Sequence, residues 1–290
     1  MKICILGVSG MLGHMLFSEL LRHGFDVYGT VRGSLLTPAH PYRERIRENV
    51  DALDISSVAS SIDALAPDVV INAIGLIRQL PEGREPLPCI QINAAFPHLL
   101  WKECAVRGIR CINYSTDCVF DGKAGRPYTE QDRPTAPDVY GLTKFLGEIA
   151  GPLATTIRTS IIGPELRGKH SLIEWLLAQQ DSVRGFTGAI YTGLPTSEHA
   201  RILAEYILPR PNLEGLFQVS APPISKYELL RLVAQAYEKS IDIIPDGIVQ
   251  EDKRLSSAAF TAITGYEPPP WPEMIVTMRE AHVFSASQWS

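Results

Sequence analysis

A tyrosine and a lysine four residues apart are the pair best suited to acid catalysis in this sequence. Tyr140 and Lys144 belong to the run Tyr-Gly-Leu-Thr-Lys. On a helix both side chains project from one face, one turn apart. A phenol has a pKa of about 10, and a lysine ammonium about 4 Å away can lower it toward neutral pH, where a general acid works best. The spacing alone is weak evidence, because it is also common on solvated helix faces.

A threonine supplies a third polar group for the same chemistry. Ser115-Thr116-Asp117 ends a predicted strand, Arg110 to Tyr114. Open parallel sheets bind their ligands at the carboxyl ends of the strands. The Thr116 hydroxyl can hydrogen-bond the oxygen that receives the Tyr140 proton and so stabilise developing charge. We therefore expect Thr116, Tyr140 and Lys144 to act together on a carbonyl group.

A glycine-rich segment lies between the first predicted strand, Lys2 to Leu6, and a helical pattern that begins near Met11. In this context the first glycine permits a tight turn, the second admits a pyrophosphate, and the third lets strand and helix pack closely. The helix start adds free N–H groups and a partial positive charge. The alternative is an ordinary turn with incidental glycines. The expected dinucleotide site comprises Gly7, Ser9, Gly10, Met11, Leu12 and Gly13.

The end of the second predicted strand, Phe25 to Val31, bears on which cofactor binds. An acidic residue there would bind the ribose hydroxyls of NAD and repel a 2′-phosphate. This sequence has Arg32 instead. The cation favours NADP(H), with NAD(H) as the second choice, although an arginine at a strand end can also be simply solvated.

Strands alternate with helices over the first half of the chain, which predicts a Rossmann-like α/β fold with a doubly wound parallel sheet. We expect residues 1–160 to form the dinucleotide-binding domain. Residues 161–290 should form mainly a smaller C-terminal substrate-binding lobe, with some segments returning to the first domain. The glycine-rich stretch 185–193 breaks the alternation, 266–271 reads as extended, and the final ten or so residues read as loosely held.

Composition narrows the classes of function. A net charge of -5 argues against a nucleic-acid partner. The longest apolar stretches fall far short of the ~20 residues that span a bilayer, so we expect no membrane partner. Five cysteines without metal-type spacing indicate reduced thiols in a cytoplasmic protein and no protein-held metal. The oligomeric state stays open, with a homodimer as one outcome.

These residues together resemble the extended short-chain dehydrogenase/reductases, and within them the dTDP-4-dehydrorhamnose reductases and related sugar-nucleotide reductases. The resemblance covers most of the chain. Its most specific pieces are 7–13, Asn72-Ala73, Asn93, the run 115–122, the run 139–144 with Gly147-Glu148, and Arg158-Thr159-Ser160. It implies that the cofactor site also includes Asp54, Ile55, Asn72, Ala73, Ile74 and Asn93, with Tyr140 and Lys144 holding the nicotinamide end.

The resemblance implies a catalytic trio of Thr116, Tyr140 and Lys144, and substrate contacts from Cys118, Val119, Phe120 and Arg254. Cys118 stands where that family usually has tyrosine. The implied reaction is NADPH-dependent reduction of the 4-keto group of a nucleotide-linked 6-deoxy sugar, in deoxysugar or surface-polysaccharide biosynthesis. Two alternatives remain: an epimerase on the same fold, and a non-catalytic regulatory subunit that resembles that of methionine adenosyltransferase.

Overall fold

Seven parallel strands form the central sheet of the computed structural model, which describes residues 1–34, 40–166 and 168–289. The sheet order is β10-β6-β5-β4-β1-β2-β3. Its strands are β1 (Lys2–Leu6), β2 (Asp26–Thr30), β3 (Ile46–Arg47), β4 (Val69–Asn72), β5 (Arg110–Thr116), β6 (Ala154–Thr159) and β10 (Gly215–Gln218). The strand order reverses between β1 and β4, which is where a doubly wound sheet opens a crevice for ligands. The expected Rossmann-like fold is confirmed.

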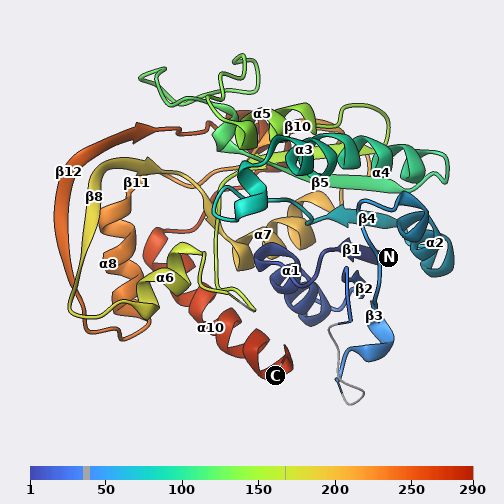
Figure 1. The fold of residues 1–290 in the computed structure, drawn as a ribbon, viewed down its shortest axis with the longest axis horizontal. Helices are drawn as coiled ribbons and strands as arrows, with labels where there is room; N and C mark the ends of the chain where they lie inside the picture. Colours follow the sequence, from blue (N-terminus) through green and yellow to red (C-terminus); the bar gives the residue numbers. More distant parts are fainter. Residues whose placement is uncertain (35–39, 167, 290) are drawn as a thin grey trace.

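Helices cover both faces of this sheet, as Figure 1 shows. The α-helices are α1 (Met11–Arg22), α2 (Ile55–Leu65), α3 (Pro86–Cys89), α4 (Phe96–Ala105), α5 (Val139–Leu146), α6 (Leu172–Ala178), α7 (Thr196–Ile202), α8 (Lys226–Ala236), α9 (Ala258–Thr264) and α10 (Trp271–Trp289). Shorter turns are η1 (Arg43–Arg45), η2 (Pro81–Arg84) and η4 (Asp117–Val119), and π-helical turns are η3 (Ile90–Ala95) and η5 (Leu203–Ile207).

Alternation along β1 divides the core into two clusters. Ile3 and Ile5 pack with residues of α1, α7 and α10 on one face of the sheet. Cys4 and Leu6 pack with residues of α2 and α4 on the other face. Because successive side chains of a strand point to opposite faces, a strand buried on both faces must be apolar throughout, as β1 is.

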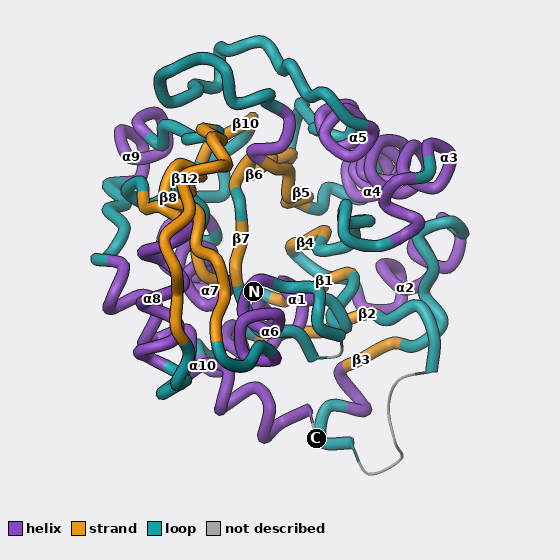
Figure 2. Tube along the Cα trace, turned by 60° about the vertical axis from the view of Figure 1, so that its left-hand side comes forward, coloured by secondary structure: helices purple, strands orange, loops and turns teal. Residues whose placement is uncertain are grey.

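A second, three-stranded sheet of order β11-β8-β12 lies at one end of the molecule (Figures 1 and 2). Its strands are β11 (Ile224–Ser225), β8 (Ser182–Tyr191) and β12 (Asp242–Asp252), and α8 packs against β8 and β12. β7 (Ile161–Ile162) comes directly after β6 in the chain and pairs in parallel with β9 (Leu194–Pro195). β10 returns from the second half of the chain to the edge of the central sheet.

The stretch 185–193 lies largely within β8 of the second sheet, where Gly185 packs closely against Tyr227 and Ile243, so its glycine permits this close packing. One sequence expectation in this half is wrong. The chain end is helical to Trp289 instead of loosely held. The Trp289 ring packs edge-on to Phe17 at 5.7 Å between centroids, and its Nε1 donates to Ser18 Oγ at 3.1 Å.

Candidate active site

A cavity of about 800 Å³ opens at the carboxyl ends of β4 and β5, between the central sheet and the second lobe. Residues from the glycine loop, the end of β4, the β5–α5 region and the second lobe line it together. Eleven of the residues expected from the sequence are among them: Ser9, Gly10, Met11, Leu12, Asn72, Ala73, Ile74, Thr116, Cys118, Tyr140 and Lys144. The structure therefore brings the expected cofactor and catalytic segments to one place.

The glycine loop has the shape that dinucleotide phosphates require. Gly7 has φ of +84°, and a Cβ on Gly13 would collide with the Gly7 carbonyl oxygen. A Cβ on Gly10 would meet only that same oxygen, at 3.5 Å, so the approach to Gly10 is open. Gly10 caps α1 without a side chain, and the first turn of α1 has no acidic residue. The free N–H groups and the helix dipole are left available to an anion.

Two asparagines shape the loop that continues the cavity wall beyond β4. Asn72 donates to Asn113 Oδ1 at 2.9 Å and accepts from the Ile74 N–H at 3.1 Å. Asn93 binds both backbone groups of Leu76, at 2.9 and 3.0 Å. Asn93 itself does not line the cavity, so it holds the loop that does.

The three expected catalytic residues come from β5 and α5. Asp138 caps α5 by accepting from the Gly141 N–H at 2.8 Å. A Cβ on Gly141 would collide with the Cys118 carbonyl oxygen, so this glycine allows the start of α5 to approach the end of β5. Thr116 and Lys144 are buried, and the Lys144 Nζ donates to the Tyr114 carbonyl at 2.6 Å.

Burial determines the protonation of this group. It raises the pKa of Tyr140 well above its ordinary value; the Cys118 thiol nearby adds to this rise, and hydrogen bonding with Thr116 opposes it. Burial lowers the pKa of Lys144 to about 8, and the Glu148 carboxylate opposes that shift. The expected lowering of the phenol pKa by lysine is therefore not what the structure gives. Tyr140 is a neutral phenol, which is the form that donates a proton.

Three residues expected at the adenosine end lie outside the lining of this cavity. Arg32 is exposed just after β2. Asp54 caps α2 by accepting from the Ser56 N–H at 3.1 Å, and Ile55 is the first residue of that helix. Asp54 thus has a local structural partner, whereas Arg32 remains accessible to a ligand at the strand end.

The expected substrate contacts need correction at three positions. Val119 and Phe120 are fully buried, and Phe120 stacks on Tyr128 at 4.0 Å between ring centroids. They pack in a small apolar cluster with Leu255 instead of facing the cavity. Arg254 binds both carboxylate oxygens of Asp252, each at 2.7 Å, and does not line the cavity. Cys118 does line it, 3.9 Å from an Arg78 guanidinium nitrogen.

Several charged and aromatic residues that line the cavity were not expected from the sequence. They are Arg78, Glu165, Lys169, His170, Trp175, Tyr191, Lys226 and Glu251. Lys253 also lines it and belongs to the segment 253–255 that resembles the family's nucleotide pocket, where Arg254 was the expected contact. Lys253, beside Arg254 in the chain, is largely buried and pairs with Glu251 at 2.8 Å. Both neighbours follow directly after β12 (Asp242–Asp252), a strand that was not predicted from the sequence.

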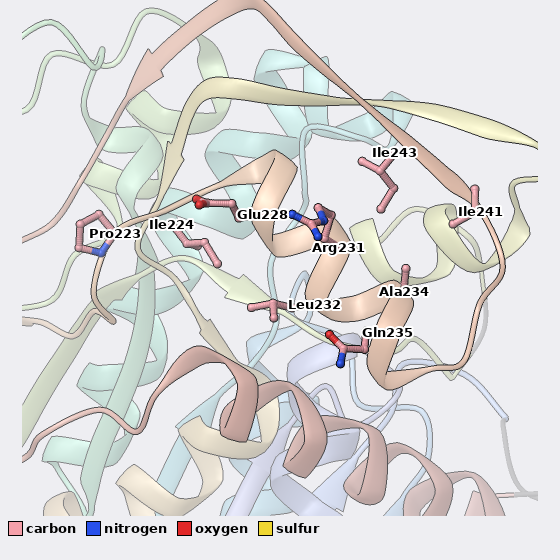
Figure 3. Close-up of a pocket in the computed structure, with 9 residues that line it drawn as sticks. All are labelled: Pro223, Ile224, Glu228, Arg231, Leu232, Ala234, Gln235, Ile241 and Ile243. Atoms are coloured by element: carbon pink, nitrogen blue, oxygen red, sulfur yellow. The ribbon is translucent and has the colours of Figure 1, made fainter.

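A second cavity of about 610 Å³ lies between α8 and the start of β12, as Figure 3 shows. Its charged lining side chains are Glu228 and Arg231. Glu228 is already engaged in the capping box of α8 with Ser225. None of the expected catalytic residues lines this cavity, whereas Thr116, Tyr140 and Lys144 line the first one.

Within the described residues, no cluster of His, Cys, Asp or Glu could hold a metal ion. No helix of the described chain is long and apolar enough to span a bilayer.

Comparisons with known proteins agree with this architecture. A family model described as "RmlD substrate binding domain" matches residues 1–237. A dTDP-4-dehydrorhamnose reductase from Streptomyces griseus is 35% identical over 147 residues, 50% of this chain and 43% of that protein. The matched region thus spans less than half of that relative's length. Methionine adenosyltransferase 2 subunit beta from Bos taurus is 30% identical over 250 residues, 81% of this chain and 72% of that protein.

A solved structure of dTDP-4-dehydrorhamnose reductase from Bacillus anthracis, in complex with NADP, superposes with a TM-score of 0.79. The likeness covers 96% of this chain and 98% of that chain at 18% identity, which shows a shared fold. Given this fold, the glycine loop and the extent of the family match, the chain belongs to the RmlD substrate-binding family of extended short-chain dehydrogenase/reductase proteins.

Proposed function

We propose that the protein is an NADPH-dependent reductase of the 4-keto group of a nucleotide-linked 6-deoxy sugar. The observation that carries this proposal is that the glycine loop and the trio Thr116, Tyr140 and Lys144 open into one cavity. Two of the similar proteins are dTDP-4-dehydrorhamnose reductases, which supports this proposal. Residues 1–160 would supply the cofactor side, and residues 161–290 mainly the substrate side.

Each member of the trio has a distinct task in this reaction. NADPH would supply hydride to the carbonyl carbon. Tyr140, a neutral phenol in the cavity, donates its proton to the carbonyl oxygen. The Thr116 hydroxyl hydrogen-bonds the same oxygen as negative charge develops on it. Lys144, buried and anchored on the Tyr114 carbonyl, presents its ammonium to the nicotinamide ribose.

The cofactor should be NADP(H), with NAD(H) accepted less well. The uncapped start of α1 fits the pyrophosphate, and the exposed Arg32 at the end of β2 fits a 2′-phosphate. Arg32→Asp should shift the ratio of kcat/KM for NADPH over NADH toward NADH by about tenfold or more, which corresponds to about 1.4 kcal/mol. Arg22→Asp, on the far end of α1, is the control. An unchanged ratio in Arg32→Asp would show that Arg32 does not contact the cofactor.

The direct assay follows nicotinamide absorbance with purified protein and dTDP- or UDP-linked 4-keto-6-deoxy sugars. Oxidation of NADPH that depends on one of these sugars supports the reductase. A redox-neutral change in the sugar supports the epimerase alternative, in which the nicotinamide is regenerated in each cycle.

The regulatory-subunit alternative rests on the 81% of the chain that aligns with methionine adenosyltransferase 2 subunit beta. That reading predicts stable association with a synthetase and no turnover of keto sugars. The burial of Lys144 beside an open cavity favours the enzyme, because a binding module has no need for a desolvated ammonium at that point.

We also propose a homodimer. The outer surfaces of α4, α5 and the neighbouring α3–η3 segment expose large apolar side chains: Leu87, Ile90, Leu99, Leu142, Phe145 and Leu146. A second copy could cover this surface by a symmetric contact. Light scattering should then give twice the chain mass, and Leu146→Glu should lower it; a monomer at micromolar concentration would contradict the proposal.

We propose a cytoplasmic location as well, since all five cysteines are free thiols in the structure. Titration of the denatured protein, isolated without reductant, should find five reactive thiols. A lower number would indicate disulfides and an oxidising compartment.

A further inference from the structure

An arginine with most of its hydrogen-bond donors unused lines the active-site cavity. Arg78, in the loop after β4, donates from Nη1 to Asp138 Oδ2 at 3.3 Å, and its Nη2 lies 3.9 Å from Cys118 Sγ. Within the described residues its guanidinium has no other acceptor. A guanidinium carries five N–H donors, and a thiol is a weak acceptor. The Arg78 side chain is 47% exposed, so its remaining donors are accessible to a ligand.

Contacts within the loop hold the backbone around Arg78. The Asn93 side chain bonds the backbone two residues before it. A Cβ on Gly83 would collide with the Ile77 carbonyl oxygen, so η2 packs directly against this part of the loop. The Arg78 carbonyl itself accepts from Arg84 Nε at 3.2 Å. The guanidinium therefore starts from a fixed point on the cavity wall, which limits the entropy lost when it binds a ligand.

Both partners of the Arg78 side chain belong to the segments that carry the trio. Cys118 comes two residues after Thr116, and Asp138 comes two residues before Tyr140. The Oδ1 atom of Asp138 caps α5, while its Oδ2 atom accepts from Arg78. One carboxylate thus connects the start of the catalytic helix to the guanidinium. Arg78, Cys118, Thr116 and Tyr140 all line the same cavity.

The neighbours of the reacting carbon decide which group of the sugar meets this arginine. In the proposed function the ketone oxygen at C4 lies at Thr116 and Tyr140, so the next substituents along the ring are those of C3 and C5. In a 4-keto-6-deoxy hexose C5 carries a methyl group and C3 carries a hydroxyl. Of these two substituents, only the C3 hydroxyl can accept a hydrogen bond from Arg78.

We propose that Arg78 binds the C3 hydroxyl of the keto sugar and is the residue that selects a hydroxyl at this position. This inference rests on the proposed function, because the trio sets the position of the ketone. A 3-deoxy sugar would leave the guanidinium without its acceptor. A 3-amino sugar would bring a second positive charge beside it. The substrate class is thereby narrowed to 3-hydroxy-4-keto-6-deoxy sugars.

The first test compares two substrates that differ only at C3. For the natural protein, kcat/KM should be about tenfold higher or more for a dTDP-linked 4-keto-6-deoxyhexose than for its 3-deoxy analogue, because a hydrogen bond to a charged group is lost. In Arg78→Met the two values should agree within about twofold. Arg78→Lys keeps the charge and loses the planar fork, so it should retain only part of the discrimination.

The second test does not depend on turnover. Calorimetry measures the binding of a dTDP-linked 6-deoxyhexose, and of dTDP alone, to the whole protein saturated with NADP⁺. Arg78→Met should raise the Kd of the sugar nucleotide about tenfold and that of dTDP less than twofold, because dTDP lacks the sugar. Arg184→Met is the matched control. Arg184 makes one contact to Asp246, at 3.2 Å from Nη1, outside the cavity lining, so both Kd values should stay unchanged.

An equal rise in Kd for the sugar nucleotide and for dTDP would overturn the proposal, because it would move the contact from the sugar to the diphosphate. Unchanged Kd values for both would remove Arg78 from the site. Equal kcat/KM for the two substrates in the natural protein would also contradict it. If no keto sugar is reduced, yet Arg78→Met weakens only the sugar nucleotide, the reductase is refuted and the sugar contact stands. A natural protein that binds no sugar nucleotide would overturn both.

Discussion

On the cofactor side of the cavity, Thr116 and Lys144 are buried at the end of a seven-stranded sheet and hydrogen-bonded to their neighbours. On the substrate side, Lys226 and Glu251 come from the second lobe and keep about a third of their side-chain surface exposed. The first side is fixed before any ligand arrives, as hydride and proton transfer require. The second side has more exposed side chains, which leaves them room to adapt to the ligand.

The largest expected effect comes from a substitution of Tyr140, on the cofactor side of the cavity. Tyr140→Phe removes the proton donor and nothing else, so kcat should fall about 10²- to 10⁴-fold. The dissociation constant for NADPH, measured by fluorescence, should change less than twofold. Tyr237→Phe, which loses a hydroxyl outside the cavity lining, is the matched control and should keep full turnover. Normal turnover by Tyr140→Phe would remove Tyr140 from the mechanism.

The second expected effect is a loss of stability at low pH, caused by two buried histidines, His14 of α1 and His199 of α7. His14 Nδ1 donates to the Gly10 carbonyl oxygen at 2.9 Å, and His199 packs edge-on against Tyr114. Burial lowers the pKa of His14 to about 4 and that of His199 to about 3. In the unfolded chain both take a proton below pH ~6.5, whereas in the folded protein they do not.

The contribution of the two neutral histidines to the free energy of unfolding should therefore be fully present above pH ~6.5. It should be lost as the pH is lowered toward 4. Between pH 7 and pH 5 the loss should be on the order of 4 kcal/mol, measured as the free energy of urea unfolding. His14→Gln should remove about half of this dependence. A free energy of unfolding that is equal at both pH values would show that neither histidine is held neutral.

A smaller effect is expected from substitutions at two neighbouring cations, Lys253 and Arg254, on the substrate side of the cavity. Lys253 lines the cavity, whereas Arg254 is held by Asp252 outside it. Lys253→Met should raise KM for the sugar nucleotide about tenfold, the equivalent of one charge-assisted hydrogen bond. Arg254→Met should raise it less than twofold. The reverse ranking, with Arg254→Met the more damaging, would restore the contact that the sequence resemblance implied.

The difference between the two sides also explains what the sequence could predict. Gly7 and Gly13 have to be glycines for steric reasons, Gly10 leaves the approach to the helix start open, and Tyr140 and Lys144 are linked by one helical turn, so local spacing is enough to find them. Glu148 and Arg158 are visible in the sequence, but their ion pair depends on the register of β5 and β6. Local patterns do not reveal such register.

The substrate side could not be predicted in the same way. Trp175, Lys226 and Lys253 reach the cavity from α6, from α8 and from the end of β12, elements far apart in the chain. The family resemblance implied that Phe120 contacts the substrate, yet the chain after the turn η4 places it in the cluster with Tyr128. A shift of one or two residues at the end of a strand changes which side chain faces the ligand.

The measurement that tests the central claim most directly is transfer of deuterium from [4,4-²H₂]NADPH to a dTDP-linked 4-keto-6-deoxy sugar, read by NMR of the product. The account predicts deuterium at C4 of the product sugar, one atom for each NADPH oxidised, and formation of this product about 10²- to 10⁴-fold more slowly by Tyr140→Phe. NADPH that is not oxidised, or a product labelled at no sugar carbon, would contradict the claim that NADPH reduces a sugar ketone at the site formed by Thr116, Tyr140 and Lys144.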